Sequence, residues 1–425
     1  MRFLRLLSVP LPLLSLSLLG GDAGAGPASS PPNPVKNPGI FIDTYFENAS
    51  PLRWDLRDGD VVELEMIHDH ARFKPNQQLT HWNFKVRATK EKVGSTITFK
   101  VANVEGCWNG VPNLAFGKYK LAVSVSPNGT DWKTIPTENI KDGRYGLQFR
   151  VTLESECTQV ARIVPYTDSD LQRTIKRIRA HPAVRVYDIG ATAEGRPLEM
   201  IEVGDPQAPH QVCMRARAHP WETGGSWLFE GLLSYLTSDD AQAADIRRQV
   251  CFCLLPMANK DGVYRGMTRF TITGADLNRD WFAGKPIDPV FAPESACLQN
   301  WLSERQRRNR LPQLFIDMHN DNDGGLHLSH PAKDRESYLQ RMDKLEKLLR
   351  EMTFFREGCK GGREGTFTNS GSSGEGIQEI YGIDGLVWEL REESAVGLGR
   401  APLHTDWQQM GASFAKVMLR YFTEK

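Results

Sequence analysis

The chain has 425 residues, with 52 Lys plus Arg against 52 Asp plus Glu, so its formal net charge at pH 7 is zero. This balance argues against a nucleic-acid-binding protein, which would show a basic excess or stripe. Hydrophobic residues make up 40% of the chain, which argues against global disorder, and seven Cys are too few for a disulfide scaffold. The length allows two or three domains with substantial cores, so the composition predicts a globular protein.

The N-terminal segment has the pattern of a secretory signal peptide. Arg2 and Arg5 precede an apolar run over residues 6–19, and small residues follow up to Ala25. The run is shorter than the roughly 20 residues that a membrane-spanning helix needs. We therefore expect a signal peptide over residues 1–25, a Pro/Ser-rich linker over residues 26–39, a secreted or periplasmic protein, and no transmembrane segment after cleavage.

Residues 40–164 show a period-two pattern that predicts an all-β domain. Apolar and polar residues alternate in runs such as Thr96–Val101, as in half-buried strands, and Pro127-Asn128-Gly129 is a hairpin-turn signal. Because no helical stretch separates these runs, we expect an antiparallel sandwich.

Residues 165–425 alternate between strand and helix patterns. Thr167 is a typical helix N-cap, and apolar strand runs include Val250–Leu255 and Leu314–Met318. Helices are predicted over residues 225–238, 293–308, 333–353 and 406–423. This alternation predicts an α/β domain with a mixed sheet flanked by helices.

Two polar clusters follow predicted strands of the α/β domain, at the strand ends where ligands gather in open α/β sheets. His219 and Glu222 stand in a loop that contains Pro220, and His319 ends a later strand. A single H-x-x-E motif is weak evidence, and a lone His at a strand end is more often a core residue. Together, however, two His and one Glu form the three-ligand set of a catalytic zinc site, with a fourth position for water.

Two further features carry charge in this half of the chain. Asn278 and Arg279 are adjacent and could hold a carboxylate by charge-assisted hydrogen bonds, although such pairs are also common in surface turns. Glu389 stands inside the apolar run Leu386–Leu390. It is either a solvent-facing strand residue or a buried base beside a metal.

Five blocks of sequence, taken in order, resemble the zinc metallocarboxypeptidase family, peptidase M14. The blocks are Glu194–Leu198, His219–Glu222, Asp276–Arg279, Asp317–His319 and Glu389–Arg391. Residues 216–223 and 256–263 are most similar to the cytosolic carboxypeptidase-like subgroup, which also carries an all-β domain before the catalytic one. The signal peptide would make this chain a secreted version.

The resemblance implies one zinc ion per chain. His219, Glu222 and His319 would bind the ion, and Asp276 would orient His219 as a carboxylate behind the ligand.

The resemblance also implies hydrolysis of the C-terminal peptide bond of peptides or proteins. Glu389 would be the general base, and Arg269 would polarise the scissile carbonyl. Asn278 and Arg279 would hold the terminal carboxylate of the substrate. The loop Ser370–Gly376, expected to line the specificity pocket, carries Glu375 and no basic residue, which favours a basic or neutral terminal residue over glutamate.

Two alternatives stay open. A zinc amidase acting on cell-wall peptides would use the same metal and base with a different substrate clamp. A non-catalytic binding protein could retain the zinc site, although the presence of both Arg269 and Glu389 speaks against decay. The sequence leaves open the preferred terminal residue, the disulfide pairing, the role of the sandwich and the oligomeric state.

Overall fold

The structure, a computed structural model, describes residues 39–57, 60–72, 76–108, 110–113, 121–142, 144–362 and 370–424. The predicted signal peptide lies outside these ranges, as does the predicted linker except for its last residue. Residues 38–425 cluster into one unit that contains both the β-rich and the α/β parts.

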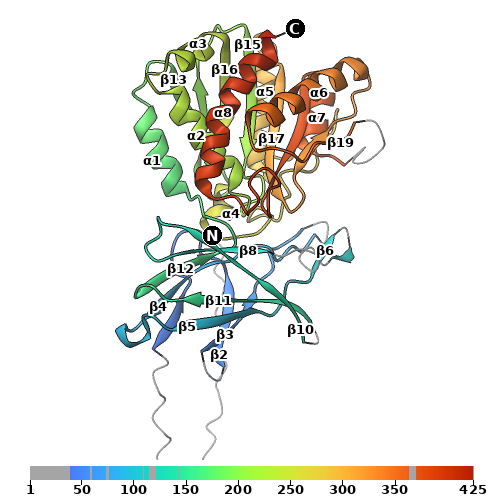
Figure 1. The fold of residues 1–425 in the computed structure, drawn as a ribbon. Coiled ribbons are helices and arrows are strands. Elements are labelled where there is room, and N and C mark those ends of the chain that lie inside the picture. Colours follow the sequence, from blue (N-terminus) through green and yellow to red (C-terminus); the bar gives the residue numbers. More distant parts are fainter. Residues whose placement is uncertain are drawn as a thin grey trace, which may run out of the picture. The chain divides into compact units, whose positions relative to one another are not determined.

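Two sheets form the β-rich part (Figure 1). The first contains, in spatial order, β1 (Ile40–Asp43), β4 (Asn83–Ala88), β12 (Cys157–Ala161), β8 (Ala122–Ser126) and β9 (Lys133–Pro136). The second contains β10 (Glu138–Asp142), β11 (Arg144–Thr152), β5 (Thr96–Val101), β3 (Val61–Met66) and β2 (Leu52–Arg57). A separate hairpin joins β6 (Gly106–Trp108) and β7 (Val111–Asn113), and a single 3-10 turn, η1, spans Lys90–Lys92.

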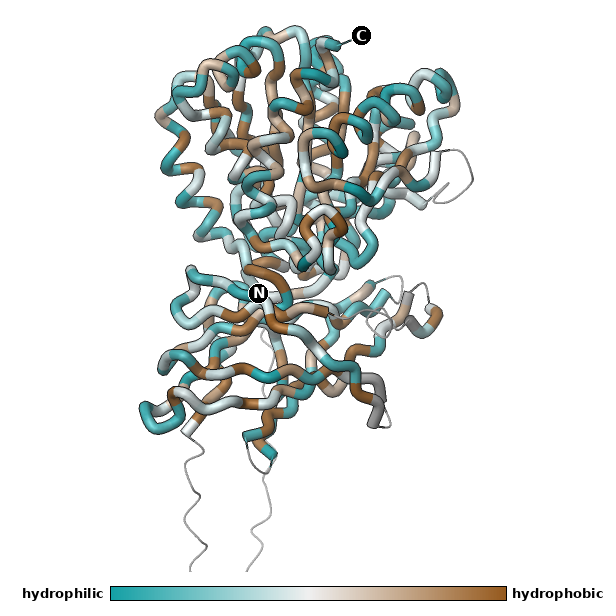
Figure 2. The backbone as a smooth tube through the Cα atoms, viewed as in Figure 1, coloured by the Kyte–Doolittle hydropathy of each residue, from teal (hydrophilic) through white to brown (hydrophobic). Residues whose placement is uncertain are grey.

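Alternating burial explains how these strands form a core. In β5 the buried residues Ile97, Phe99 and Val101 alternate with more exposed neighbours. The ring of Phe99 lies 5.3 Å from that of Phe84 and 5.5 Å from that of Phe149, measured between centroids. The predicted all-β region is therefore confirmed, and Figure 2 shows apolar and polar stretches alternating along its strands.

One pairing departs from the antiparallel prediction. β3 and β5 pair in parallel, with Val62 opposite Phe99. Between them the chain passes through β4, which belongs to the other sheet, so it returns to the second sheet in its original direction.

An eight-stranded mixed sheet forms the α/β part. Its spatial order is β13 (Val184–Ala191), β14 (Pro197–Val203), β16 (Val250–Leu255), β15 (His210–Ala216), β17 (Leu314–Asp321), β20 (Asp384–Arg391), β18 (Gly325–Leu328) and β19 (Cys359–Gly361). The four central strands β16, β15, β17 and β20 run parallel to one another. Their carboxyl ends therefore meet at one edge of the sheet.

Helices cover both faces of this sheet. They are α1 (Asp168–Ile178), α2 (Gly224–Leu236), α3 (Ala241–Gln249), α4 (Lys260–Tyr264), α5 (Pro293–Arg307), α6 (Arg335–Met352), α7 (Ser373–Tyr381) and α8 (His404–Thr423). Buried residues of α1, α2, α6 and α8 share one apolar cluster with Met214, whereas residues of α5 and α7 share another with Cys213. Because successive strand residues point to opposite faces, the two clusters lie on opposite sides of the sheet.

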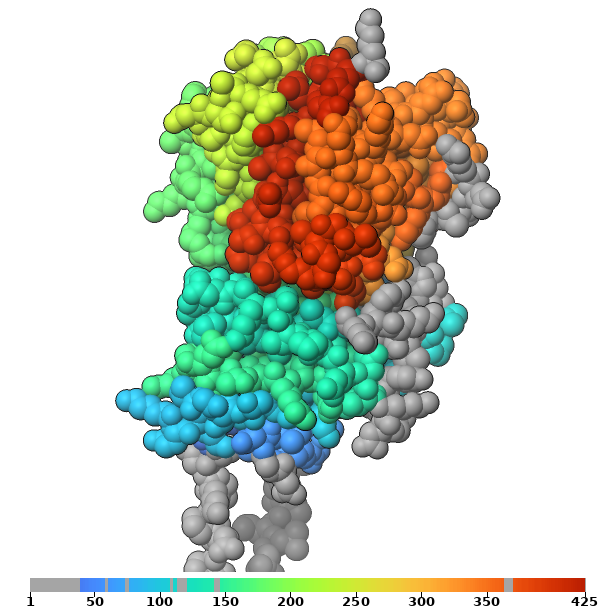
Figure 3. Space-filling model, in the orientation of Figure 1, coloured from blue at the N-terminus to red at the C-terminus, as the bar shows by residue number. Residues whose placement is uncertain are grey.

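The predicted α/β domain with a mixed sheet and flanking helices is thus confirmed. Figure 3 shows α8, in red, crossing the visible surface of this domain between the yellow-green and orange segments. Among the described helices, none is both long enough and apolar enough to span a bilayer. All seven cysteines are described, and each is a free thiol.

Candidate active site

A tight turn after β15 presents His219 and Glu222. Arg217 adopts a left-handed backbone conformation, with φ of 60°, that few residues other than Gly occupy. Its buried side chain donates from Nε to the carbonyl oxygen of Pro220 at 2.9 Å, and from Nη1 to that of Tyr166 at 2.8 Å. The guanidinium therefore links the turn to Tyr166 and stabilises the loop that carries His219 and Glu222.

Two glycines follow the turn and begin α2. A Cβ atom on Gly225 would lie 2.8 Å from Cβ of Met318 and 2.9 Å from Cβ of Ala216. Only glycine fits this close approach, so it allows α2 to begin directly against β15 and β17.

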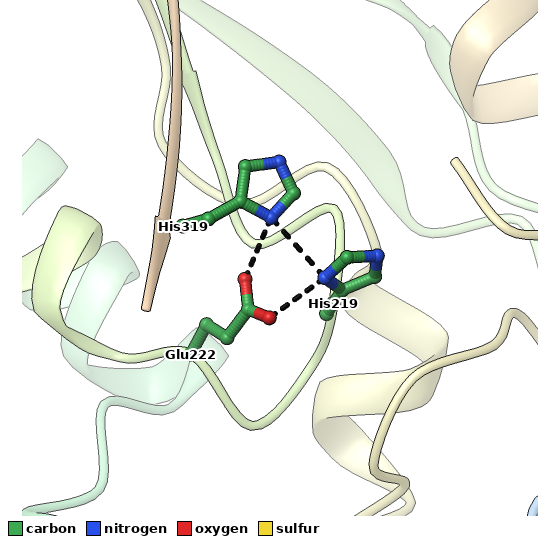
Figure 4. A group of neighbouring side chains, drawn as sticks. All are labelled: His219, Glu222 and His319. Carbon is green, nitrogen blue, oxygen red and sulfur yellow. Dashed lines mark hydrogen bonds and ion pairs between the residues drawn. The ribbon is translucent and has the colours of Figure 1, made fainter. Parts of the chain in front are cut away.

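His219, Glu222 and His319 converge on one point (Figure 4). Nδ1 of His219 lies 2.7 Å from Oε1 of Glu222, and Nδ1 of His319 lies 2.8 Å from Oε2. The two Nδ1 atoms are 3.1 Å apart, and all three side chains are buried. Two imidazoles and one carboxylate in this arrangement form a donor set suited to a divalent metal such as zinc.

Each imidazole has a carboxylate behind it. Nε2 of His219 lies 3.2 Å from Oδ1 of Asp276, the carboxylate that the family resemblance implies behind this ring, and Nε2 of His319 lies 3.0 Å from Oδ2 of Asp317. A carboxylate on one ring nitrogen holds the proton there and leaves the other nitrogen available as a ligand. Asp317 is not among the predicted site residues, although residues two apart on a strand share a face and this spacing could have indicated its role.

The buried charges around the ligand set are mutually compensated. Burial raises the pKa of Asp317, but Arg215 and His319 lower it more, so the carboxyl group stays ionised. Arg215 is itself buried, and its Nε donates to Oδ1 of Asp317 at 2.9 Å. Burial likewise opposes the ionisation of Glu222, yet His219 and His319 lower its pKa to about 2. Glu222 and Asp317 are therefore both ionised near neutral pH, and their negative charges favour a bound cation.

Glu389 lies directly beside the ligand set. It stands on β20 opposite His319 of β17 in the parallel ladder. Glu389 is half-buried, and its Oε2 atom is shielded from solvent with no hydrogen-bond partner in the described part of the chain. Burial, with a contribution from Asp321, raises the pKa of Glu389 well above its usual range. An unpartnered carboxylate in this position is suited to accept a proton.

Arg269 shares the carboxylate that orients His219. Its Nε and Nη2 atoms lie 2.9 Å and 2.7 Å from Oδ2 of Asp276. Burial raises the pKa of Asp276, but Arg269 and His219 lower it far below its usual range. One carboxylate thus fixes both a candidate metal ligand and a candidate carbonyl-polarising cation.

Asn278 and Arg279 lie near the same centre. The Asn278 side-chain oxygen accepts a hydrogen bond from the backbone N–H of Ser373 at 2.8 Å. Since the oxygen is occupied, the amide nitrogen is the group that Asn278 can offer to a ligand. Arg279 is half-buried, and burial lowers its pKa, but an arginine remains a cation at neutral pH.

Most of the predicted site residues line one cavity of about 310 Å³, whereas His319 and Asp276 lie directly behind its wall. The predicted residues on its wall are His219, Glu222, Arg269, Asn278, Arg279 and Glu389. Glu375 also lines it, with Oε2 accepting from Oγ of Ser370 at 3.1 Å. Gln78 and Thr80 of the β-rich part also line the cavity, and no sequence pattern predicts this contribution. The structure therefore gathers every predicted site residue at or directly behind one cavity.

Comparisons with known proteins agree with this geometry. Residues 171–354 match the family model described as zinc carboxypeptidase, peptidase M14. The chain is 29% identical over 262 residues to cytosolic carboxypeptidase 2 of Xenopus tropicalis, covering 56% of this chain and 27% of that protein. It is 30% identical over 204 residues to cytosolic carboxypeptidase 6 of Caenorhabditis elegans, covering 44% of each. The chain thus spans less than half the length of these relatives.

Solved structures show the same fold. A metallo-carboxypeptidase from Burkholderia cenocepacia superposes with a TM-score of 0.75 at 19% identity, covering 90% of this chain and 98% of that one. Because this coverage exceeds the α/β domain, the shared fold includes the β-rich part.

Proposed function

Residues 171–354 of this chain belong to the zinc carboxypeptidase family, and from this premise we propose that the protein is a zinc-dependent metallocarboxypeptidase. It would hydrolyse the C-terminal peptide bond of peptides or proteins. The proposal rests on one observation: a two-His, one-Glu donor set adjoins a cavity lined by Glu389 and two arginines, and Oε2 of Glu389 has no hydrogen-bond partner in the described part of the chain.

His219, Glu222 and His319 would hold the zinc ion. When bound, zinc supplies Lewis acidity, which lowers the pKa of a coordinated water to about 7 and polarises a carbonyl group. Asp276 and Asp317 keep the Nε2 protons of the two imidazoles in place, so that both Nδ1 atoms stay available as ligands.

Arg279 and Asn278 would bind the terminal carboxylate of the substrate. The guanidinium offers paired N–H donors and a positive charge, and the Asn278 amide adds a neutral donor. A peptide without a free carboxyl group would lack the carboxylate that these two side chains bind, so this pair would restrict cleavage to the last residue.

Glu389 would accept the proton of the attacking water and later deliver it to the leaving amine. Its raised pKa favours the first half of this transfer, because a carboxylate with a higher pKa is a stronger base when ionised. Arg269, held in orientation by Asp276, would stabilise the negative charge that develops on the scissile carbonyl oxygen.

The test is mass-spectrometric profiling of a peptide library with the purified protein, with chelator, and with zinc added back after chelation. The proposal requires loss of single C-terminal residues that chelator abolishes and zinc restores. Cleavage confined to internal or cell-wall cross-link amide bonds would support an amidase instead. Stoichiometric zinc without any product would support a binding protein.

The N-terminal sequence also supports export. Residues 1–25 have the basic start, apolar run and small-residue exit of a signal peptide, although the relatives named above are called cytosolic carboxypeptidases. We expect the exported protein to begin at Gly26. N-terminal sequencing of protein recovered outside the cytoplasm checks this, and an intact Met1 would contradict it.

A further inference from the structure

The β-rich part contacts the backbone segment that carries Arg269. Asp69, which follows β3, accepts from the backbone N–H of Thr268 at 3.0 Å through Oδ1. Its Oδ2 accepts from the N–H groups of Arg269 and, at 3.1 Å, of Phe270. One carboxylate from the sandwich thus satisfies three consecutive amides of the α/β domain.

These three amides have no ready substitute for Asp69. Thr268, Arg269 and Phe270 are buried. The exposed fractions of the whole residues are 5%, 4% and 3%, respectively. Buried N–H groups without an acceptor cost about 1–3 kcal/mol each, so the segment depends on this carboxylate for its conformation.

The carbonyl side of the same segment is held by the α/β domain. The Thr268 oxygen accepts from the backbone N–H of Trp221 at 3.4 Å, in the loop between His219 and Glu222. The Phe270 oxygen accepts from Nδ2 of Asn259 at 3.1 Å. Segment 268–270 is therefore hydrogen-bonded through its carbonyl groups to the α/β domain, including the loop with His219 and Glu222, and through its N–H groups to the sandwich.

Two more contacts join the sandwich to the chain around segment 268–270. The backbone N–H of Arg72 donates to the Gly274 oxygen at 3.3 Å, and a Cβ atom on Gly274 would lie 3.0 Å from that nitrogen. Gln78 places Oε1 3.5 Å from Nη1 of Arg269 and lines the same cavity. The sandwich thus touches both the backbone and the guanidinium of Arg269.

We propose that the β-sandwich contributes to the active site and that Asp69 is a positioning residue for Arg269. This inference rests on the proposed function, because it gives Asp69 a role in turnover through the carbonyl-polarising arginine. Asp69 itself does not line the cavity and contacts no candidate metal ligand in the described part of the chain.

The test compares Asp69→Ala with Asp43→Ala in the full-length, zinc-loaded protein. Asp43 is a matched control because its carboxylate also bonds a backbone N–H, that of Tyr45 at 2.9 Å, and pairs with Arg87, both within the sandwich. Hydrogen exchange followed by mass spectrometry should show peptides over residues 268–270 exchanging about tenfold faster in Asp69→Ala and unchanged in Asp43→Ala. Unchanged exchange in Asp69→Ala would overturn the positioning role.

Kinetics on a C-terminal peptide substrate supply the second measurement. Asp69→Ala should lower kcat by about 10- to 100-fold, the effect of a small misplacement of a catalytic group, with zinc content intact and KM changed far less. In an Arg269→Ala background the same substitution should lower kcat no further. An equal loss in both backgrounds, or loss of zinc, would overturn the proposal.

Failure of the variant to fold and absence of activity in the wild type can each be distinguished from failure of the positioning role. If Asp69→Ala does not fold, Asp69→Asn keeps the shape with a single acceptor oxygen, and the same exchange and kinetic shifts should appear in smaller measure. If the wild-type protein releases no terminal residue, the proposed function fails, while the exchange measurement still decides whether Asp69 holds segment 268–270.

Discussion

Nε2 of His319 lies 3.0 Å from Oδ2 of Asp317, two residues earlier on the same buried strand. The opposite nitrogen of the ring faces Glu222 and His219. The strand thus carries both a candidate metal ligand and the group that fixes its tautomer, and Arg215 on β15 compensates the charge of that group.

Asp317→Asn should weaken zinc binding about 10- to 100-fold, the usual effect of removing a carboxylate behind a metal-bound imidazole. The amide no longer favours a proton on Nε2, so Nδ1 is a poorer ligand. Titration against a competing chelator measures the affinity. Asp384→Asn is the control. Asp384 is the first residue of β20, and it pairs with the surface residue Arg341 of α6. Equal zinc affinity in both variants would remove this role from Asp317.

Arg279→Ala should reduce kcat/KM about 10- to 100-fold on a peptide with a free terminal carboxylate, the loss expected for charge-assisted hydrogen bonds. The amidated form of the same peptide, a poor substrate from the start, should be affected much less. Arg308→Ala, which removes only an exposed arginine paired with Glu304, serves as the control. A similar loss on both peptides would contradict the carboxylate clamp.

Glu294 should make stability depend on pH. Burial raises its pKa to about 7, so the folded protein keeps a proton that the unfolded chain releases near its ordinary value of 4.5. The stability from this group is complete below that ordinary value and is lost as pH rises through about 7. The difference in unfolding free energy between Glu294→Gln and the wild type should therefore shift in favour of the variant by up to about 3 kcal/mol from pH 4.5 to pH 8.

Urea denaturation at both pH values measures this difference. Glu304→Gln on the same helix is the control, because Glu304 is solvent-exposed and ion-paired. A Glu294→Gln difference that does not change with pH would show that the carboxyl group ionises normally in the folded protein.

The parts of the site that sequence could predict are those carried by short local patterns. His219 and Glu222 stand three residues apart, and His319 directly follows the apolar run Leu314–Met318, so local sequence indicates all three as candidate ligands. The long helices α5 and α8 could be predicted because their patterns extend over several turns. β18 and β19, with four and three residues, are too short for a periodic pattern.

What sequence could not predict depends on contacts between distant segments. Asp69 precedes Thr268 by 199 residues, and no local pattern links a loop of the sandwich to that backbone. The pairing of Arg162 with Glu392 at 2.8 Å, both fully buried, spans 230 residues and joins the sandwich to the end of β20. The adjacency of Glu389 and His319 likewise follows from strand order, which the sequence pattern leaves undetermined.

Glu389→Gln is the sharpest test of whether Glu389 is the base of a metal-dependent carboxypeptidase. Zinc content and release of the terminal residue from a free-acid peptide are measured together, by metal analysis and mass spectrometry. We predict full zinc occupancy with kcat lowered at least about 100-fold, because the amide cannot take up the proton. Turnover at the wild-type rate in a variant that retains its zinc would contradict the account.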